Sequence, residues 1–598
     1  MTAGSVLTLV DDDASAAAAT GPVGLLCEMP PDADLPAKHT GALGIYALLG
    51  DPDQARERAS QLVEKLVAGE PCLRGIQQLR VFEEVLKNRC KIAFHVLHLV
   101  DWLKANGIKT CVLPQRSWLA SHAQALSSYG GVDIRFAAGG AGKAGSGFSQ
   151  RERIVRIAGR LRDGKFSGQT LREEWRQVLD RIDPFHRRQA LRKQSENWRP
   201  GEIWFYSTAY TFTRVGLAYE PYFPAPFRFM VENAATGGAP LDHAARPFVS
   251  IYQFSARHLA PARDEVASAA ETIETHLTQF PLTGAEAQAR DILVAGAFFA
   301  EFKARLLPAG LYQTALFEAW AERTRPRALV VGNPVFEAYA LWAARKRGIP
   351  TIFLQHGAFG PHATGSDPPA DHFVLQGRFW KTCLPDAPRA RAIVLNTPQC
   401  APSLPPRGER RAILFLTAPY SVQPLWAASG VNDILSDLLQ CADERERELI
   451  VRVHPMEKMG DYRRRVGLLT SDRAPGAAVS FSQGGRMEDV LARSAVAVTF
   501  SSSAFLDCLR WQVPVVTFGW HDFEYRKAIA AQDVFHFARS RAELKRLVLS
   551  ALDGKLPVFA NSAEPFAAQM PADTLRRAFT AMVDGAVAAD AFDKTKIA

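Results

Sequence analysis

Short apolar runs alternate with helix-length segments through the second half of the 598-residue chain, and this pattern constrains the fold more than any other feature. Residues 328–332 (ALVVG) and 351–354 (TIFL) have the composition of buried strands, and residues 336–346 between them have helical spacing. A strand, a helix and a second strand in this order predict parallel pairing through a right-handed crossover.

The same alternation continues towards the C-terminus. Strands that alternate with helices of this length are typical of a doubly wound parallel sheet. We therefore predict an α/β fold with two Rossmann-like domains that face a cleft, and with a helical elaboration at the N-terminus. The strands of the second series are expected at 412–416, 449–453, 496–500 and 513–518, and its helices at about 431–442, 487–493 and 504–511.

A chain of this length exceeds one hydrophobic core, and composition suggests where it divides. Residues 1–45 are rich in Ala, Asp, Gly and Pro and predict a weakly structured lead-in with one strand at 6–10. Helical spacing then continues to about residue 106, before a strand at 108–113. The expected order is the lead-in 1–45, an N-terminal Rossmann-like domain 46–397 with a basic helical insertion at about 150–200, a Pro-rich linker 398–406, a C-terminal Rossmann-like domain 407–560 and a helical tail 561–598.

The net charge of +9 favours anionic partners, namely nucleotide phosphates, acidic lipid headgroups or nucleic acid. The sequence contains no RNA-binding signature and no zinc finger, so we expect no nucleic-acid partner. The basic residues at about 150–200 form either a solvated face of long helices or a peripheral contact with acidic lipid of the inner membrane or with an anionic glycan.

No segment reaches the roughly 18 apolar residues that a transmembrane helix requires, and the N-terminus lacks the basic region of a signal peptide. We therefore expect a cytoplasmic protein, with peripheral contact at the inner membrane as an extension of that expectation. The eight cysteines are scattered without zinc-ligand spacing, so the sequence predicts neither a metal site nor a disulfide framework.

Polar residues are concentrated where the predicted strands end. Ligands of doubly wound sheets bind beyond the carboxyl ends of the strands, so these residues are the first candidates for a site. They are Asn333-Pro334, Gln355-His356-Gly357, Thr417 to Tyr420, His454-Pro455, Ser501 to Ser503 and Gly519 to Asp522.

The His454-Pro455 pair ends the strand predicted at 449–453. Pro455 prevents the strand from continuing and favours extended geometry at His454. An imidazole fixed at the edge of a sheet is suited to donating a hydrogen bond to a phosphate oxygen or to protonating a leaving group.

Three serines, Ser501, Ser502 and Ser503, separate the strand at 496–500 from the following helix. Hydroxyls and free N–H groups at a helix N-terminus form an anion site. The alternative is that one serine simply caps the helix. Because His454 ends another strand of the same predicted sheet, we favour the anion site.

Gln355, His356 and Gly357 belong to the other half of the chain and are expected to face the cleft from its opposite side. Gly357 permits a positive φ, which lets the backbone approach a ligand closely. His356 is either a ligand-facing group or an ordinary core or surface histidine.

Three segments resemble motifs of bacterial GT-B-fold transferases that assemble surface polysaccharides from cytidine-activated donors. This group includes capsule and lipopolysaccharide Kdo transferases, HP-motif sialyl- and polysialyltransferases and CDP-glycerol glycerophosphotransferases. Residues 449–455 (LIVRVHP) resemble its strand and HP motif, and residues 348–357 (GIPTIFLQHG) resemble its strand with a terminal His-Gly pair. Residues 498–527 resemble its Ser-Ser turn, helix and acidic loop. The resemblance covers about residues 325–550.

The resemblance implies a GT-B-like, metal-independent transferase that needs no cofactor besides its nucleotide-sugar donor. The C-terminal domain is then the donor domain and the N-terminal domain the acceptor domain. His356 is implied as the general base and His454 as the second catalytic residue. The implied donor-binding residues are Gln355, Gly357, Thr417, His454, Pro455, Ser501, Ser502, Ser503, Asp522 and Glu524.

Kdo and sialyl transferases also carry a catalytic carboxylate in the N-terminal domain. Glu232, Asp242 and Asp367 are candidates, and no motif selects among them. The implied reaction moves a Kdo- or sialic-acid-type sugar from a CMP-activated donor to a surface polysaccharide or glycolipid acceptor. Three alternatives stay open: a CDP-glycerol or CDP-polyol phosphotransferase, a UDP-sugar transferase or 2-epimerase, and a non-catalytic scaffold of a glycan-export assembly.

Overall fold

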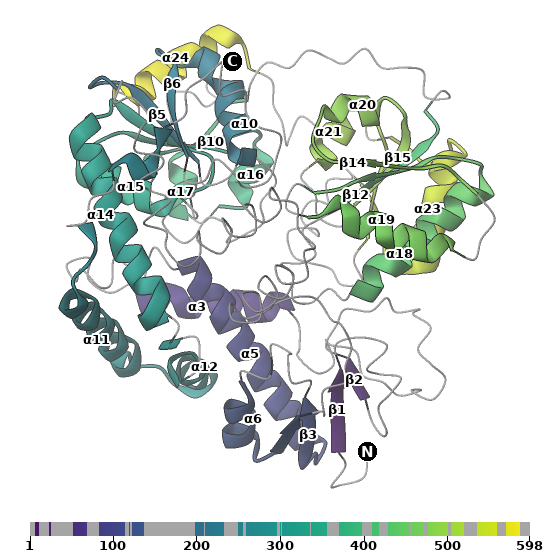
Figure 1. Ribbon diagram of the computed structural model, residues 1–598, viewed down its shortest axis with the longest axis horizontal. Coiled ribbons are helices and arrows are strands. Elements are labelled where there is room, and N and C mark those ends of the chain that lie inside the picture. The colour runs from purple at the N-terminus through teal and green to yellow at the C-terminus, as the bar shows by residue number, and fades with distance from the viewer. Residues whose placement is uncertain are drawn as a thin grey trace, which may run out of the picture.

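The computed structural model shows two α/β domains above a third, smaller unit near the N-terminus (Figure 1). The described residues are 6–10, 23–25, 52–67, 83–113, 119, 122–136, 198–207, 210–231, 249–254, 259–295, 299–300, 302–334, 337–355, 370–384, 386–396, 410–417, 428–454, 457–471, 476–499, 504–518, 535–558 and 570–585.

Within these ranges the strands form three sheets in which the paired strands run parallel. The first Rossmann sheet has the order β11-β10-β9-β8-β5-β6-β7. Its strands are β5 (Ile203–Ser207), β6 (Phe227–Val231), β7 (Val249–Ser250), β8 (Ala328–Val331), β9 (Thr351–Leu354), β10 (His372–Leu375) and β11 (Ala392–Val394).

The second Rossmann sheet has the order β14-β13-β12-β15-β16-β17. Counted along the chain, both sheets follow the doubly wound order 3-2-1-4-5-6, with one further edge strand in the first. The predicted α/β fold with two Rossmann-like domains is therefore confirmed. The strands of the second sheet are β12 (Ala412–Leu416), β13 (Leu449–Arg452), β14 (Val479–Ser482), β15 (Ser494–Thr499), β16 (Val515–Phe518) and β17 (His536–Ala538).

The central strands of both sheets are buried on both faces, as their uninterrupted apolar sequences predict. Every residue of β8, β12 and β15 is buried. In the second sheet, α18 (Ala428–Glu444) and α23 (Arg541–Leu552) share one core with the strands, while α20 (Met487–Leu491) and α21 (Phe505–Arg510) pack on the other side.

One continuous cluster of buried side chains contains residues of both Rossmann sheets. Phe373 and Leu375 of β10 belong to it together with Leu414 and Leu416 of β12. The two domains therefore share apolar packing. The helices that accompany the first sheet are α10 (Tyr210–Tyr219), α14 (Leu307–Thr324), α15 (Ala338–Lys346), α16 (Phe379–Thr382) and α17 (Asp386–Ala390), with the 3-10 helices η3 (Glu220–Tyr222) and η4 (Ile251–Phe254). The π-helix η6 (Phe302–Leu306) leads into α14.

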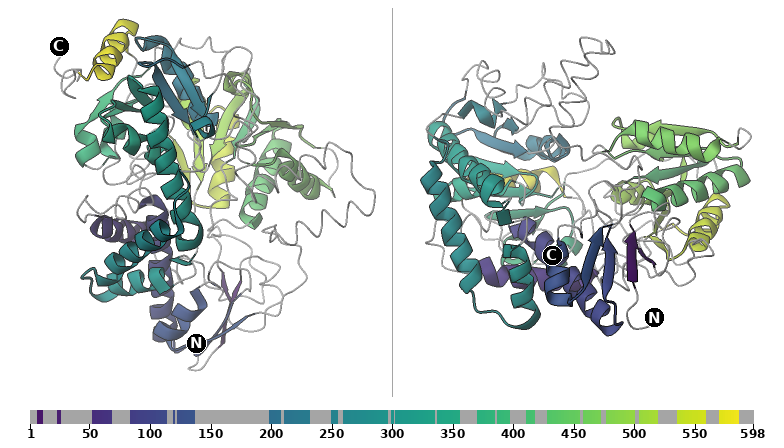
Figure 2. Two further views of the ribbon diagram at one scale, coloured as in Figure 1. Left: turned by 60° about the vertical axis from the view of Figure 1, so that its left-hand side comes forward. Right: turned by 60° about the horizontal axis from the view of Figure 1, so that its bottom comes forward.

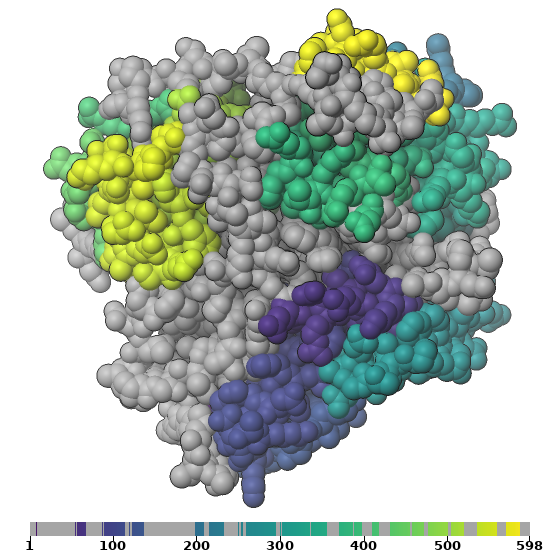
Figure 3. All heavy atoms as spheres, turned by 180° about the vertical axis from the view of Figure 1, so that it is seen from behind, coloured from purple at the N-terminus to yellow at the C-terminus, as the bar shows by residue number. Residues whose placement is uncertain are grey.

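The N-terminal unit contains a four-stranded sheet of its own, with the order β2-β1-β3-β4. Figure 3 shows its helices against a helix pair from the middle of the chain, and both groups belong to one hydrophobic core. Its strands are β1 (Val6–Val10), β2 (Val23–Leu25), β3 (Thr110–Leu113) and β4 (Asp133–Phe136), and its helices are α3 (Pro52–Val67), α5 (Glu83–Ala105) and α6 (Ala123–Gly130). The helix pair from the middle of the chain is α11 (Arg263–Gln279) and α12 (Gly284–Ala295).

This unit departs from the expected organisation. The strand predicted at 6–10 is confirmed as β1, but the structure makes it a central strand that pairs with both β2 and β3. The first Rossmann sheet begins at Ile203 rather than near residue 46. The pairing of β1 with β3 is distant in sequence, and local spacing carries no information about such pairing. Figure 2 shows the unit from two further sides.

The C-terminal helix α24 (Ala572–Val583) returns to the first Rossmann sheet, where the Phe579 ring stacks on Phe223 with ring centroids 4.2 Å apart. The second Rossmann domain therefore lies between two segments that belong to the first. Among the described helices, none has the length and apolar character needed to cross a membrane.

Candidate functional site

The order of the second Rossmann sheet reverses between β12 and β15, which lie side by side. Ligands of doubly wound sheets bind outside the carboxyl ends of the strands at such a point. Thr417 directly follows β12, and His454 lies two residues beyond β13. The candidate site is therefore the carboxyl edge formed by β12, β13 and β15.

Thr417 and His454 are joined directly at this edge. The His454 N–H donates to Thr417 Oγ1 over 2.8 Å, and the Thr417 N–H donates to the Arg452 carbonyl over 3.1 Å. Thr417 is buried, so its hydroxyl serves as an internal link between the two strand ends. The structure thus brings together two residues that the sequence predicted as donor-binding.

The carbonyl of His454 is held as firmly as its N–H. It accepts hydrogen bonds from Gln483 Nε2 over 3.0 Å and from the Glu457 N–H over 2.9 Å. The peptide groups on both sides of the His454 Cα are therefore fixed, and the direction in which the side chain leaves the backbone is fixed with them.

The imidazole of His454 is half-buried, and this burial lowers its pKa below the ordinary value for histidine. The ring is therefore neutral near pH 7. A neutral ring donates a hydrogen bond from one nitrogen and accepts a proton on the other. A bound phosphate favours the protonated form, because an opposite charge nearby raises the pKa of a histidine.

The loop after β14 completes the neighbourhood of His454. Gly484 and Gly485 have φ of 76° and 69°, in the left-handed region where glycine is favoured. Arg452 donates to the Ser482 hydroxyl and, over 3.1 Å, to the Gly485 carbonyl. This loop carries Gln483 towards the His454 carbonyl.

Sequence reasoning missed Gln483 and Glu457. Gln483 follows β14, whose VSFS sequence is only half-buried and gave no buried-strand signal. Glu457 lies three residues after His454. A carboxylate so close to the His-Pro pair is the sequence signal that could have identified it.

The carboxyl edge of the first Rossmann sheet is organised differently. Gln355 follows β9 and is fully buried; its Oε1 accepts from the Gln376 N–H over 2.8 Å, and its carbonyl accepts from Gln376 Nε2 over 3.0 Å. Glu337 is also fully buried, and its carboxylate accepts from the N–H groups of Gly332 and Asn333, each over 2.8 Å. These groups fix the strand ends from within, and a donor-binding role for Gln355 stays a prediction.

Several predicted site residues lie outside the described part of the chain, together with the linker 398–406 and residues 151–197 of the basic insertion. Their predicted roles stay predictions. The site residues in question are His356, Gly357, Pro455, Ser501, Ser502, Ser503, Asp522 and Glu524, and the three candidate carboxylates are Glu232, Asp242 and Asp367.

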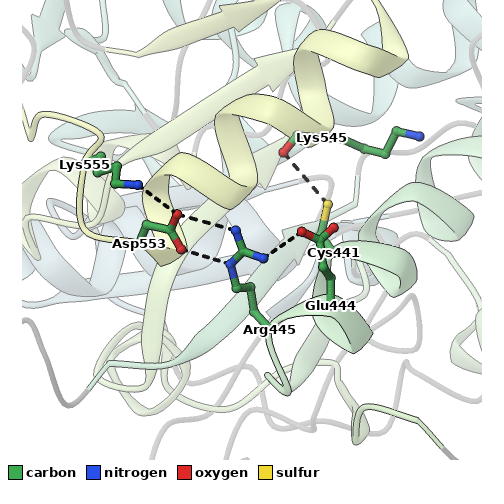
Figure 4. Close-up of polar contacts among 6 residues, drawn as sticks. All are labelled: Cys441, Glu444, Arg445, Lys545, Asp553 and Lys555. Carbon is green, nitrogen blue, oxygen red and sulfur yellow. Dashed lines mark hydrogen bonds and ion pairs between the residues drawn. The ribbon is translucent and has the colours of Figure 1, made fainter.

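A second polar cluster in the C-terminal domain lies where α18 and α23 end (Figure 4). Arg445 pairs with Glu444 over 2.6 Å and with Asp553 over 2.9 Å, and Lys555 reaches Asp553 over 3.3 Å. Both helices run back from the carboxyl edge, so this cluster lies at the amino edge of the sheet. Cations at helix C-termini complement the helix dipole. We interpret the cluster as a structural connection between the two helices.

Among the described residues, no group of three or more His, Cys, Asp or Glu side chains is placed to hold a metal ion. The described cysteines are buried and unpaired. Burial raises the pKa of Cys90 and of Cys111 to about 12, so both are thiols at neutral pH.

No protein-family model and no curated protein sequence matches this chain. Among solved structures it is similar to Acinetobacter baumannii MurG, with 11% sequence identity, a TM-score of 0.38, and coverage of 64% of this chain and 99% of that one. It is also similar to a UDP-GlcNAc 2-epimerase from Neisseria meningitidis bound to UDP-GlcNAc, with 10% identity, a TM-score of 0.38, and coverage of 63% and 98%. The lipopolysaccharide outer core galactosyltransferase WaaB shows 10% identity, a TM-score of 0.35, and coverage of 64% and 100%. Because these sequence identities and TM-scores are low, the fold assignment rests on the strand order of the two sheets.

Proposed function

We propose that this protein is a nucleotide-sugar-dependent glycosyltransferase of GT-B-like architecture. The observation that supports the proposal most is the linked pair Thr417 and His454 at the carboxyl edge of a doubly wound sheet, beside its switch point. In the proposal this edge binds the donor, and the first Rossmann domain supplies the acceptor side of a shared cleft.

The proposed chemistry assigns complementary roles to the two edges. Glycosyl transfer requires hydrogen-bond donors that stabilise the departing phosphate and a base that takes the proton of the acceptor hydroxyl. His454 and the hydroxyls of Ser501 to Ser503, which follow β15, are the proposed phosphate ligands. His356, directly after Gln355, is the proposed base.

The proposed donor is a CMP-activated sugar of the Kdo or sialic-acid type, and the proposed acceptor is a surface polysaccharide or glycolipid. The support is the position of the two motifs that carry the resemblance: the His-Pro pair follows β13, and the serines follow β15. Asp522 or Glu524 is proposed to contact the nucleoside. The proposal places the reaction in the cytoplasm, with a peripheral contact at acidic inner-membrane lipid and without a metal.

The test is a calorimetric titration of the protein with CMP, CDP, UDP and GDP, repeated on His454→Ala. We expect CMP to bind most tightly and His454→Ala to weaken its binding by about tenfold or more, because a hydrogen bond to a charged phosphate is lost. The thermal unfolding midpoint of the variant should stay near that of the parent, since the ring is only half-buried.

The nucleotide that binds most tightly distinguishes the proposed function from its alternatives. Tighter binding of CDP than of CMP favours the CDP-polyol phosphotransferase. Binding of UDP alone rejects a cytidine donor and favours a UDP-sugar transferase or 2-epimerase. If no nucleotide binds, or if His454→Ala binds as the parent does, the proposed donor site is wrong and the scaffold alternative gains.

A further inference from the structure

Glu457 lies at the centre of a hydrogen-bonded chain that ends on the backbone of His454. Its Oε2 accepts from the Thr417 hydroxyl over 2.7 Å and from the Tyr462 hydroxyl over 2.9 Å. Thr417 Oγ1 in turn accepts the His454 N–H over 2.8 Å. One carboxylate oxygen therefore receives two hydroxyls, and one of these supports the proposed phosphate ligand.

The carboxylate determines which way the Thr417 hydroxyl points. A threonine hydroxyl has one proton and two lone pairs, and its proton rotates to the best acceptor. With the proton directed at Glu457, a lone pair of Oγ1 is left to receive the His454 N–H. A hydrogen bond to an ionised carboxylate is about twice as strong as one between neutral groups, so this orientation is strongly preferred.

Tyr462 and Gln483 anchor Glu457 itself. Tyr462, on α19 (Met459–Thr470), is buried and brings its hydroxyl to the carboxylate. Gln483 Nε2 donates to the carbonyls of both Glu457 and His454, over 2.8 and 3.0 Å. The chain thus ties together the ends of β12, β13 and β14 and the start of α19.

The network acts on the His454 backbone. Burial lowers the pKa of His454. A carboxylate close to the ring would raise that pKa. The hydrogen bonds from Thr417 to Glu457 and from the His454 N–H to Thr417 reach the His454 backbone, so the role inferred for Glu457 is to fix where the ring lies.

We infer that Glu457 is a positioning residue that acts through Thr417 to hold His454 in its phosphate-binding orientation. The inference rests on the proposed function, because it presumes that His454 contacts the nucleotide phosphate. It adds a residue to the site and gives Thr417 an internal role in addition to its predicted contact with the donor.

The test compares nucleotide affinity in Glu457→Met, Glu457→Gln and the matched control Glu448→Met. Glu448 precedes β13 at the opposite edge of the sheet, where it accepts from the Ser480 hydroxyl over 2.6 Å and pairs with Arg493. We expect Glu457→Met to weaken CMP binding about five- to tenfold, through loss of the acceptor. Glu457→Gln, which keeps an accepting oxygen, should recover most of the affinity, and Glu448→Met should bind as the parent does.

A double-mutant cycle of Glu457→Met with Thr417→Val identifies the route. If Glu457 and Thr417 act through one hydrogen-bonded chain, their losses of affinity are not additive. The double variant should then bind CMP about as weakly as whichever single variant binds it more weakly. The pH at which affinity changes should be the same in Glu457→Gln as in the parent, because the inferred route from Glu457 to His454 runs through Thr417 to the backbone N–H. Thermal unfolding of each variant separates lost affinity from lost folding.

The positioning role of Glu457 and the proposed donor site can fail separately. Additive losses in the cycle, or a Glu457→Met variant no weaker than Glu448→Met, refute the positioning role while the donor site stands. A shifted pH profile in Glu457→Gln shows that the carboxylate acts on the ring and also refutes it. If His454→Ala keeps full affinity, the proposed function fails first, whatever the Glu457 variants do.

Discussion

The two Rossmann sheets share one strand order but present different chemistry at their carboxyl edges. On the first sheet Glu337 and Gln355 are both 0% exposed and engaged with neighbouring backbone, while Asn333 and Gln376 are half-buried. On the second sheet the His454 backbone is held in the same way, but its ring is only half-buried. Topology therefore locates both edges, and the half-buried imidazole is the titratable group described at the second.

This contrast suggests a division of labour. At the first edge Glu337 and Gln355 form an internal frame, and Gln355 anchors the chain directly before His356. The second edge offers the proposed phosphate ligand. The following predictions, from the largest effect to the smallest, test whether the two edges differ in this way.

The first prediction concerns His356. If it is the base supplied by the first sheet, His356→Ala should slow sugar transfer by about 10²- to 10⁴-fold, the usual contribution of a general base. Nucleotide affinity should not change, because the donor binds to the other edge. Nucleotide release from the activated sugar measures the rate, and calorimetry measures the affinity.

A histidine outside the site provides the control. His536 lies on the edge strand β17, where its Nε2 contacts the Pro557 carbonyl over 3.1 Å, and His536→Ala should leave transfer unchanged. If His356→Ala transfers as fast as the parent, the first sheet supplies no base and the division of labour is wrong.

The second prediction concerns the frame. Glu337→Ala removes the acceptor of two backbone N–H groups, and each such unsatisfied group costs about 1 to 3 kcal/mol, so the free energy of unfolding should fall by roughly 2 to 4 kcal/mol. Glu337→Gln keeps an accepting oxygen and should lose less. Urea denaturation measures both.

Glu337→Ala should lower stability without lowering nucleotide affinity. At temperatures where Glu337→Ala is folded, its CMP affinity should equal that of the parent. A weakened nucleotide affinity in a folded Glu337→Ala protein would mean that the first edge also contributes to donor binding.

The sequence predicted most of the second half of the fold because the signal there is local. Strands β9 and β12 have their expected bounds, and β13, β15 and β16 agree within two residues. Continuous apolar runs between helices are sufficient for such strands. The strand β5 (IWFYS), although fully buried, was not predicted. In the N-terminal sheet β1 and β3 were expected as strands, but their pairing across a long separation was not, and neither were β2 and β4.

The site was predictable to the extent that it depends on strand ends. Thr417 and His454 each follow a predicted strand, and the structure joins them. Glu457 and Gln483 could not be selected, because their roles arise from hydrogen bonds between loops after different strands. Such contacts depend on the order of the strands in the sheet, which spacing along the sequence does not determine.

The third prediction uses two glycines with opposite surroundings. A Cβ at Gly216 of α10 would lie 2.7 to 2.8 Å from three atoms of the fully buried Phe205 ring, so Gly216→Ala should destabilise the protein by about 1 to 3 kcal/mol. Gly467 of α19 has nothing within 4 Å of such a Cβ, so Gly467→Ala should stabilise by about 0.5 to 1 kcal/mol. Thermal and urea unfolding measure both. Equal effects at the two positions would show that the interface between α10 and β5 is looser than described.

The fourth prediction has the smallest expected effect and concerns the pH dependence of nucleotide binding. Burial lowers the pKa of His454 in the free protein, and a bound phosphate raises it again. Affinity is therefore highest below the free-state pKa, falls as pH rises towards the bound-state pKa, and is constant above it. A difference of one pKa unit between the two states corresponds to a tenfold change, so we expect a change of about tenfold or less between pH 5.5 and 8.

The His454→Gln variant isolates this effect, because the phosphate of the free nucleotide titrates in that range identically in both experiments, and any difference in the bound state comes from the imidazole. The ratio of the two dissociation constants should vary with pH only through the imidazole. A ratio that is constant with pH would mean that the ring is not at the phosphate. His454 would then be, like Glu337 and Gln355, part of a frame, and the difference between the two edges would disappear.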